Sequence, residues 1–192
     1  MVQRVVSLFS GIGGFEAGFS GLPLATSLMC EIDPAASSVL TERFPGIDVI
    51  ADICQLKALP ECDIVVAGWP CQDLSQAGRT AGISGQQSGL IGEFFRLIDA
   101  SPTKPDTIVL ENVAFALSLQ KGRAIHYVTE ALQSRGYKWA YRILDTREFG
   151  LPQRRRRIFI CASQSRLPSE ILFDGIGVQP SSEPDPTHVG FY

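Results

Sequence analysis

Cys71 is the first residue whose position suggests chemistry, because it directly follows Pro70 in the segment AGWPCQDLSQAG (67–78). The apolar run DIVVAG (63–68) ends just before it, and a polar, glycine-bearing loop follows it. Open α/β sheets place their sites at the carboxyl ends of strands, and a thiolate is an effective nucleophile. The pattern therefore predicts a nucleophilic thiol. The alternative is a small buried apolar side chain, the common fate of a cysteine, which the polar loop disfavours.

Glu111 closes a second apolar run, DTIVLEN (106–112), and is followed by Val113. A carboxylate at such a strand end is partly removed from water, which favours its protonated form and suits a general acid. The alternative is that Asn112 caps a helix and that the acid beside it is incidental.

A run of four arginines lies in the segment GLPQRRRRIFI (150–160). Alternate residues of an extended chain face the same way, so Gln153, Arg155 and Arg157 share one face, and Arg154 and Arg156 share the other. One face can meet a site while the other stays solvated. The alternative is a wholly solvated charge run.

A glycine-rich turn, FSGIGG (9–14), follows the apolar run RVVSL and opens a helical pattern. Glycines at such a turn allow a ligand to approach the backbone, and a carboxylate about 20 residues later, here Glu31, can accept hydrogen bonds from ribose hydroxyls. Gly14 directly follows Gly13, which departs from G-x-G-x-x-G and favours a nucleoside-type ligand over a dinucleotide. The alternative is a tight turn with an unrelated acid.

Six apolar runs bounded by turn residues predict strands, and helical patterns lie between the earlier runs. The alternation predicts an α/β fold with a doubly wound, mostly parallel sheet covered on both faces. The last two strands follow each other without a helix, so we expect an antiparallel pair at one side of the sheet. The strands are expected at 4–9, 24–31, 63–68, 106–112, 137–145 and 156–162, and the helices at 13–20, 34–44, 88–99 and 122–135.

Two segments lack periodicity. Residues 72–87 carry three glycines, and a loop of this length in a compact domain is typical of a functional lid. From about residue 164 the chain has few helix or strand signals, so residues 164–192 are predicted to be a linker or the start of another domain.

The composition fits one globular protein domain, with 192 residues, 45% hydrophobic residues and a formal net charge of −3. No stretch approaches the ~20 apolar residues of a membrane span, and the start lacks the features of a signal peptide, so we expect a cytoplasmic protein without a membrane partner. The five cysteines form no C-x-x-C pair, so free thiols are expected, with neither a disulfide framework nor a metal site.

The segments SLFSGIGGFEAGF, EID, GWPCQDLSQAG, ENV and YRILDTREFGLPQRRRRIFI occur in this order. Together they resemble the cytosine-5 DNA methyltransferases of bacterial restriction-modification systems and phages, from residue 4 to about 162. The resemblance implies a Rossmann-like methyltransferase fold, S-adenosylmethionine as methyl donor with S-adenosylhomocysteine as product, and cytosine in double-stranded DNA as substrate. A transfer-RNA cytosine methyltransferase with the same motifs is the alternative.

The resemblance also implies a mechanism. Cys71 would add to C6 of a flipped-out cytosine, Glu111 would hold and protonate N3, and Arg155 with Arg157 would bind the base carbonyl and a neighbouring phosphate. The loop 72–87 would close over the base. The further substrate-binding residues would be Gln72, Ser75, Asn112, Val113 and Gln153.

The cofactor would lie against the glycine turn and the next strand ends. The resemblance implies that one aromatic residue faces the adenine and that the glycines lie near the methionine part of the cofactor. It also implies that one carboxylate contacts the ribose and another the adenine. The implied residues are Phe9, Gly11, Ile12, Gly13, Gly14, Glu31, Ile32, Asp52, Ile53, Pro70 and Leu90.

The sequence departs from the family pattern in several places. Ser7 stands where Asp is usual and Leu74 where Phe is usual. Beyond residue 162, the family's target-recognition domain and its closing cofactor-binding segment are not recognisable. We therefore expect residues 1–163 to form an incomplete catalytic and cofactor-binding domain. The chain would be a fragment or a split subunit that needs a complementing polypeptide, or a non-catalytic partner subunit.

Overall fold

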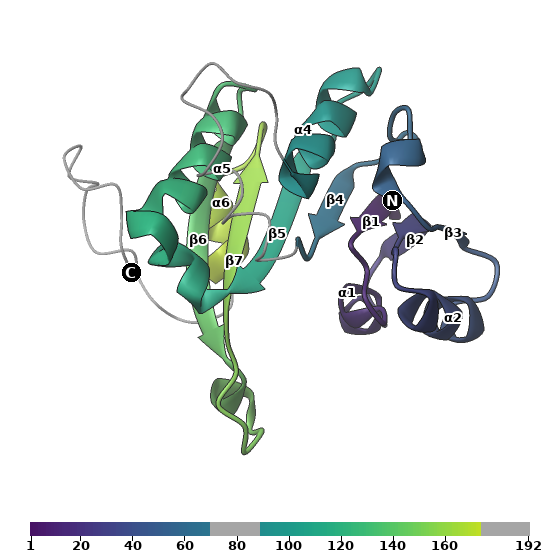
Figure 1. The fold of residues 1–192 in the computed structure, drawn as a ribbon, viewed down its shortest axis with the longest axis horizontal. Coiled ribbons are helices and arrows are strands. Elements are labelled where there is room, and N and C mark those ends of the chain that lie inside the picture. Colours follow the sequence, from purple (N-terminus) through teal and green to yellow (C-terminus); the bar gives the residue numbers. More distant parts are fainter. Residues whose placement is uncertain (70–88, 174–192) are drawn as a thin grey trace.

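A computed structural model describes residues 1–69 and 89–173. Within them, seven strands form one sheet in the order β3-β2-β1-β4-β5-β7-β6 (Figure 1). The predicted strands are all present, and each observed boundary lies within one residue of the predicted one. The strands are β1 (Gln3–Leu8), β2 (Leu24–Cys30), β3 (Asp48–Ile50), β4 (Ile64–Ala67), β5 (Thr107–Val113), β6 (Lys138–Asp145) and β7 (Arg156–Ser163).

The sheet is mostly parallel, as the alternation of strands and helices predicted. Strands β3, β2, β1, β4 and β5 pair in parallel. Strand β7 inserts between β5 and β6 and pairs antiparallel with both. The expected antiparallel pair at one side of the sheet is therefore confirmed, and β6 forms the edge.

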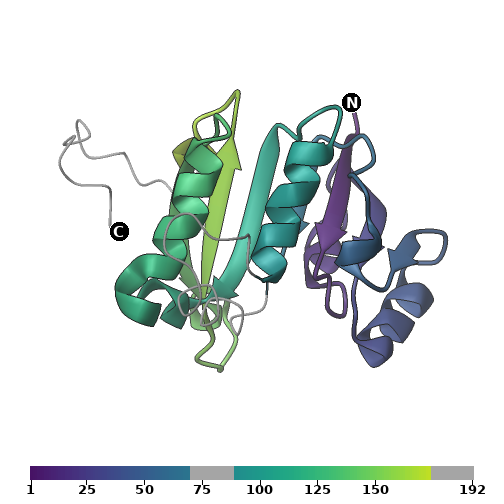
Figure 2. The ribbon, with the colours of Figure 1, turned by 45° about the horizontal axis from the view of Figure 1, so that its top comes forward.

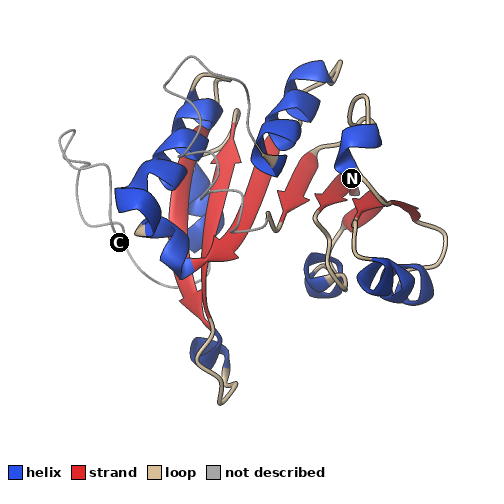
Figure 3. Ribbon diagram, in the orientation of Figure 1, coloured by secondary structure: helices blue, strands red, loops and turns tan. Residues whose placement is uncertain are grey.

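Helices cover both faces of the sheet (Figures 2 and 3). One face packs against α4 and α5, through Val6, Ile108, Ile158 and other core residues. On the opposite face, the ring of Phe15 in α1 contacts Phe159 of β7 edge to face. The helices are α1 (Gly14–Gly18), α2 (Pro34–Arg43), α4 (Leu90–Ala100), α5 (Arg123–Gln133) and α6 (Pro168–Phe173).

Local sequence signals account for several helix ends. Asp33 caps α2 by accepting the Ala36 N–H at 2.8 Å, and Pro34 occupies the first turn, where its missing N–H costs nothing. Gly136 adopts φ +86° just beyond α5, the left-handed conformation that glycine tolerates at a helix end. Both ends lie where the sequence predicted them.

One strand and one α-helix were not predicted. Strand β3 has three residues, too few for a periodic signal. Helix α6 lies in the segment expected to be a linker, and it packs on β6, where Arg142 Nη1 donates to the Leu172 carbonyl at 3.4 Å and the guanidinium lies 5.5 Å from the centre of the Phe173 ring. The expectation that residues after 164 lack a helix is therefore wrong for α6. The boundary at residue 163 between the catalytic domain and the following segment remains a prediction.

Short 3-10 helices connect several elements. They were not predicted either, because a single turn leaves no periodic pattern. They are η1 (Ile53–Gln55), η2 (Ala114–Leu117), η3 (Leu119–Gly122) and η4 (Thr146–Phe149). The predicted lid loop lies outside the described residues. Among the helices described, none is long and apolar enough to cross a membrane.

Candidate active site

The carboxyl ends of β1, β4 and β5 meet at one edge of the sheet. Because β7 runs antiparallel to β5, its first residues lie at this same edge, where Val113 of β5 pairs with Arg157 of β7. The end of β6 is there as well, since Asp145 pairs with Arg156. The topology thus gathers the predicted strand-end residues along one rim.

Glu111 and Arg157 form an ion pair at this rim. Arg157 Nε lies 2.8 Å from Glu111 Oε1, and their side chains are 22% and 24% exposed. Burial raises the pKa of the Glu111 carboxyl, although the charges of Arg157 and Arg155 and the hydrogen bond from Arg157 act in the opposite direction. The carboxyl is thus partly desolvated, as its strand-end position suggested.

The second oxygen of Glu111 lies against Gly68, a residue that the sequence reasoning did not single out. A β-carbon on Gly68 would stand 3.5 Å from Glu111 Oε2 and 3.5 Å from the Phe9 carbonyl oxygen. The Gly68 N–H donates to the Leu8 carbonyl at 3.3 Å. The ends of β1, β4 and β5 therefore converge at Gly68. A glycine directly after a strand and just before WPC was the signal available for it.

Asn112 anchors the end of β4 rather than capping a helix. Its Nδ2 donates to the Trp69 carbonyl at 3.0 Å, its Oδ1 accepts the Val113 N–H at 2.7 Å, and it is 3% exposed. Val113, not Asn112, precedes η2. The bond to Trp69 fixes the place where the chain leaves the sheet beside Glu111.

Glu31 holds the glycine turn in place. Its Oε2 accepts the Gly11 N–H at 2.7 Å and its Oε1 accepts the Asp33 N–H at 2.9 Å. A carboxylate offers about four lone-pair positions, so two remain for a ligand. Phe9, directly before this turn, has φ +54°, a conformation that is uncommon for a residue other than glycine and is found preferentially at functional sites.

Gly13 is required by packing between two helices. It has φ +84°, and a β-carbon there would lie 2.3 Å from the Phe44 ring at the end of α2. Around Gly11 and Gly14, by contrast, a β-carbon would meet nothing within 4 Å. These two glycines, with the exposed Ile12 and Ile32, leave room at the surface of the turn.

Asp52 and Ile53 follow β3 and have different surroundings. Asp52 Oδ1 accepts the Cys54 N–H at 2.9 Å. Ile53 is 3% exposed and belongs to the hydrophobic core, so little of its side chain can meet a ligand. Leu90 begins α4 and packs partly buried against the same core.

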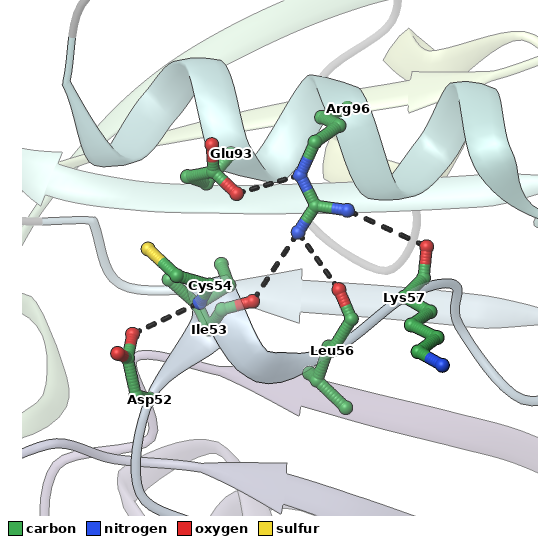
Figure 4. Close-up of polar contacts among 7 residues, drawn as sticks. All are labelled: Asp52, Ile53, Cys54, Leu56, Lys57, Glu93 and Arg96. Carbon is green, nitrogen blue, oxygen red and sulfur yellow. Dashed lines mark hydrogen bonds and ion pairs between the residues drawn. The ribbon is translucent and has the colours of Figure 1, made fainter.

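Arg96 connects α4 to η1 and was not predicted from the sequence (Figure 4). Its Nη2 donates to the carbonyl of Leu56 at 2.8 Å and to that of Ile53 at 3.4 Å, and its Nε pairs with Glu93 at 2.6 Å. These bonds hold the turn that begins at Asp52.

The arginine run divides as the alternation predicted. The charges of Arg155 and Arg157 act on Glu111, whereas Arg154 and Arg156 line a separate pocket beside β6. Gln153 is exposed, and its carbonyl accepts a hydrogen bond from the Thr146 hydroxyl.

The family model for C-5 cytosine-specific DNA methylases matches residues 3–188. The chain belongs to this family. The type II methyltransferase M2.BsuMI of Bacillus subtilis is 47% identical to it over 185 residues, which are 95% of this chain and 46% of that protein. M.AquIA of a Picosynechococcus species is 33% identical over 98% of this chain and 78% of its own length. The chain thus spans about half the length of M2.BsuMI.

Solved structures of methyltransferases share the fold of this chain. The crystal structure of S. pombe Dnmt2 methyltransferase has a TM-score of 0.73 at 21% identity, and covers 93% of this chain and 57% of its own. A putative DNA modification methyltransferase encoded within an E. coli prophage has a TM-score of 0.68 at 20% identity, over 88% of this chain and 50% of its own.

Ser7, at the position where the resemblance to the family led us to expect Asp, is completely buried. The hydroxyl of Ser10 lies 3.0 Å from the Ser7 hydroxyl and accepts the Cys30 N–H at 3.3 Å. The two serines thereby tie the end of β1 to the end of β2, next to the glycine turn. Ser7 thus supplies a buried hydrogen-bonding group at this position.

Four predicted site residues, Pro70, Cys71, Gln72 and Ser75, lie outside the described residues. Four other cysteines lie within the described residues. Burial raises the pKa of Cys30 to about 12 and the pKa values of Cys62 and Cys161 to about 11. The pKa of Cys54, the fourth, is raised as well. Because only the thiolate is nucleophilic, these four are poor nucleophiles at neutral pH.

Glu16 is a further residue that the sequence analysis missed. It is 7% exposed, and neither of its carboxylate oxygens has a hydrogen-bond partner in the part of the chain that the structure describes. Residues 1–69 and 89–173 contain no cluster of three or more histidine, cysteine or acidic side chains that could hold a metal ion.

Proposed function

We propose that this chain carries the catalytic chemistry of a DNA methyltransferase that transfers a methyl group to C5 of cytosine. The observation that supports this most strongly is the half-buried Glu111, paired with Arg157 and lying against Gly68 at the rim of the sheet. The chain leaves the sheet beside this carboxyl at Trp69, two residues before Cys71.

Cys71 is proposed as the nucleophile. Its thiolate forms a bond to C6 of the cytosine, and the electrons of the C5–C6 double bond move toward N3. This makes C5 an enamine carbon that can take a methyl group. The four described cysteines are poor candidates because their pKa values are raised. Loss of the C5 proton, elimination of Cys71 and return of the N3 proton to the Glu111 carboxylate then restore the neutral aromatic ring, the free thiolate and the protonated acid.

Glu111 is proposed to donate a proton to N3 as the thiolate adds. Burial raises its pKa, which increases the protonated fraction available for this step. Arg157 holds Oε1 and orients the group, while Oε2 is free of hydrogen bonds to other described side chains and lies beside Gly68. Arg155 and Arg157 would bind the base carbonyl and a neighbouring phosphate, with Gln72, Ser75, Asn112, Val113 and Gln153 around the base.

The turn 9–14 and the ends of β2 and β3 are proposed to bind S-adenosylmethionine, which supplies an electrophilic methyl group when bound. The donors and apolar groups present fit such a molecule. Glu31 and Asp52 offer carboxylate acceptors for hydroxyl and amino groups, and Ile12 and Ile32 are 59% and 67% exposed at the same rim. The open space around Gly11 and Gly14 allows the close approach of a ligand.

DNA is proposed as the substrate rather than transfer RNA. M2.BsuMI and M.AquIA, both more than 30% identical, are named type II methyltransferases, whereas solved structures below 25% identity support the fold alone. Target recognition is proposed to come from polypeptide outside residues 1–192, either a continuation of the same chain or a second one, since these residues span about half of M2.BsuMI. Cytosine must leave the stack before Cys71 can reach C6, and protein contacts to the duplex must compensate for that cost of a few kcal/mol.

The test is transfer of a labelled methyl group from S-adenosylmethionine to duplex DNA and, in parallel, to transfer RNA, with any complementing polypeptide present. We expect label in DNA cytosines, none in transfer RNA, and none in either with Cys71→Ser. The matched control is Cys54→Ser, which changes an exposed thiol and should retain activity. Label that enters only transfer RNA would contradict the proposal.

A further inference from the structure

A pocket of about 670 Å³ lies beside β6, the edge strand of the sheet in the described residues. It lies outside the Glu111 site and has no role in the steps described above. Four arginines and two acidic residues contribute to its wall. Its lining residues are Arg142, Ile143, Asp145, Arg147, Glu148, Arg154, Arg156 and Phe173.

The charges of this pocket are only partly compensated. Arg147 pairs with Asp145 at 2.8 Å, and this arginine lowers the pKa of Asp145 to about 2, so the pair remains ionised. Arg154 and Arg156 are exposed, and neither forms an ion pair within the described residues. Together with Arg142 they carry three positive charges, and Glu148 is the one acid of the pocket lining that is left to balance them. The net charge of about +2 favours an anion.

Two contacts fix Arg142 at the wall of the pocket. Its Nη1 donates to the Leu172 carbonyl at 3.4 Å and its guanidinium stacks on the Phe173 ring. Most of its five N–H donors remain available, and the planar guanidinium suits the oxygen atoms of a phosphate. The pocket therefore presents one positioned and two exposed guanidinium groups.

The register of the sheet places this pocket next to the candidate active site. Arg156 lines the pocket and Arg157, the next residue, pairs with Glu111. Neighbouring strands are about 4.8 Å apart, so β6 and β5, on either side of β7, are separated by roughly 10 Å. Since a DNA strand carries a phosphate for about every 3.4 Å of helix axis, this separation corresponds to about three phosphates of one strand.

We propose that the pocket binds a backbone phosphate of the DNA strand that contains the target cytosine. Arg154 and Arg156 donate to the phosphate oxygens, and Arg142 supplies a fixed third guanidinium. The contact is independent of base sequence, so it contributes to affinity and to the orientation of the strand rather than to target choice. This inference rests on DNA being the substrate, as proposed above.

The test compares DNA binding by the full chain, with any complementing polypeptide, and by its Arg154→Gln/Arg156→Gln variant at several salt concentrations. Loss of one phosphate contact lowers the slope of log K against log salt by about 0.9, equally for target and non-target duplexes. Arg154→Lys/Arg156→Lys keeps the charge and should retain most of the slope. Arg166→Gln, an exposed arginine beyond the far end of β7, is the control and should leave it unchanged.

The outcomes separate this inference from the proposed function. An unchanged slope in a protein that methylates DNA overturns the phosphate site, and leaves the pocket to an acidic protein partner. A reduced slope in a protein that binds but does not methylate DNA supports the phosphate site and contradicts the proposed function. Absence of salt-dependent DNA binding in the wild-type protein overturns both. Circular dichroism melting curves show whether the variants are folded.

Discussion

The carboxylate of Glu31 accepts the Gly11 N–H at 2.7 Å and thereby joins the end of β2 to the turn that follows β1. The same carboxylate accepts the Asp33 N–H at the start of α2. Glu31 thus has a structural role in shaping the turn, in addition to the proposed role in binding the ribose. Its substitution tests both.

Glu31→Ala should weaken binding of S-adenosylhomocysteine about ten- to a hundredfold, because charge-assisted hydrogen bonds contribute ~1.5–3 kcal/mol. It should also lower the free energy of unfolding by about 1 kcal/mol, since two N–H groups lose their acceptor. Calorimetry and thermal melting measure the two effects. Glu31→Gln retains an acceptor oxygen and should be less severe in both. Unchanged affinity in Glu31→Ala would place the ribose elsewhere.

Gly13→Ala should destabilise the protein by about 1–3 kcal/mol. The added carbon overlaps the Phe44 ring, and the backbone has φ +84°, a conformation that an alanine adopts only with strain. The matched control is Gly14→Ala, where a β-carbon meets open space and the change should be much smaller. Chemical denaturation compares them. Equal stabilities of the two variants would show that α1 and α2 do not pack as described.

Glu16→Met should stabilise the chain by about 1–3 kcal/mol, because a buried carboxylate that has no hydrogen-bond partner among residues 1–69 and 89–173 is replaced by an apolar side chain of similar volume. Denaturant unfolding at neutral pH measures the change. Ser20→Ala, an exposed position just beyond α1, is the control and should have little effect. A destabilised Glu16→Met variant would indicate that the carboxylate has a partner in solution.

Glu111→Gln should raise the stability of the folded chain at neutral pH. The folded-state pKa of Glu111 lies above its unfolded value, so folding disfavours the charged form. The stability that protonation provides is fully present below the unfolded pKa, and is lost as pH rises through the folded pKa. The advantage of the variant should therefore appear at pH 7 and vanish in acid. Urea unfolding across this range checks it, and an advantage that persists in acid would contradict it.

The strand-end position and partial burial of Glu111 could be predicted from the sequence, because an apolar run that ends in an acid indicates both. Its contact with Arg157 could not. That contact depends on β7 lying between β5 and β6, whereas the sequence predicted only an antiparallel pair at one side of the sheet. The register that brings residue 111 to residue 157 is a property of the assembled sheet.

The glycine turn shows a similar limit. Its position after β1 was predictable from the glycines and the preceding apolar run, and so was a carboxylate at the end of β2. The reason for Gly13 was not, since Phe44 comes from the far end of α2 and nothing local indicates that the two meet. The core position of Ile53 was likewise hidden, because it follows from the packing of α4 on η1.

Covalent trapping on DNA that contains 5-fluorocytosine tests the central claim most directly. If Cys71 adds to C6, the fluorine at C5 cannot leave as a proton does, so the thioether should persist. With S-adenosylmethionine and any complementing polypeptide present, we predict a denaturation-resistant complex with the wild-type chain and with Cys54→Ser, and none with Cys71→Ser. A stable complex formed by Cys71→Ser, or none formed by a wild-type protein that methylates ordinary DNA, would contradict the account.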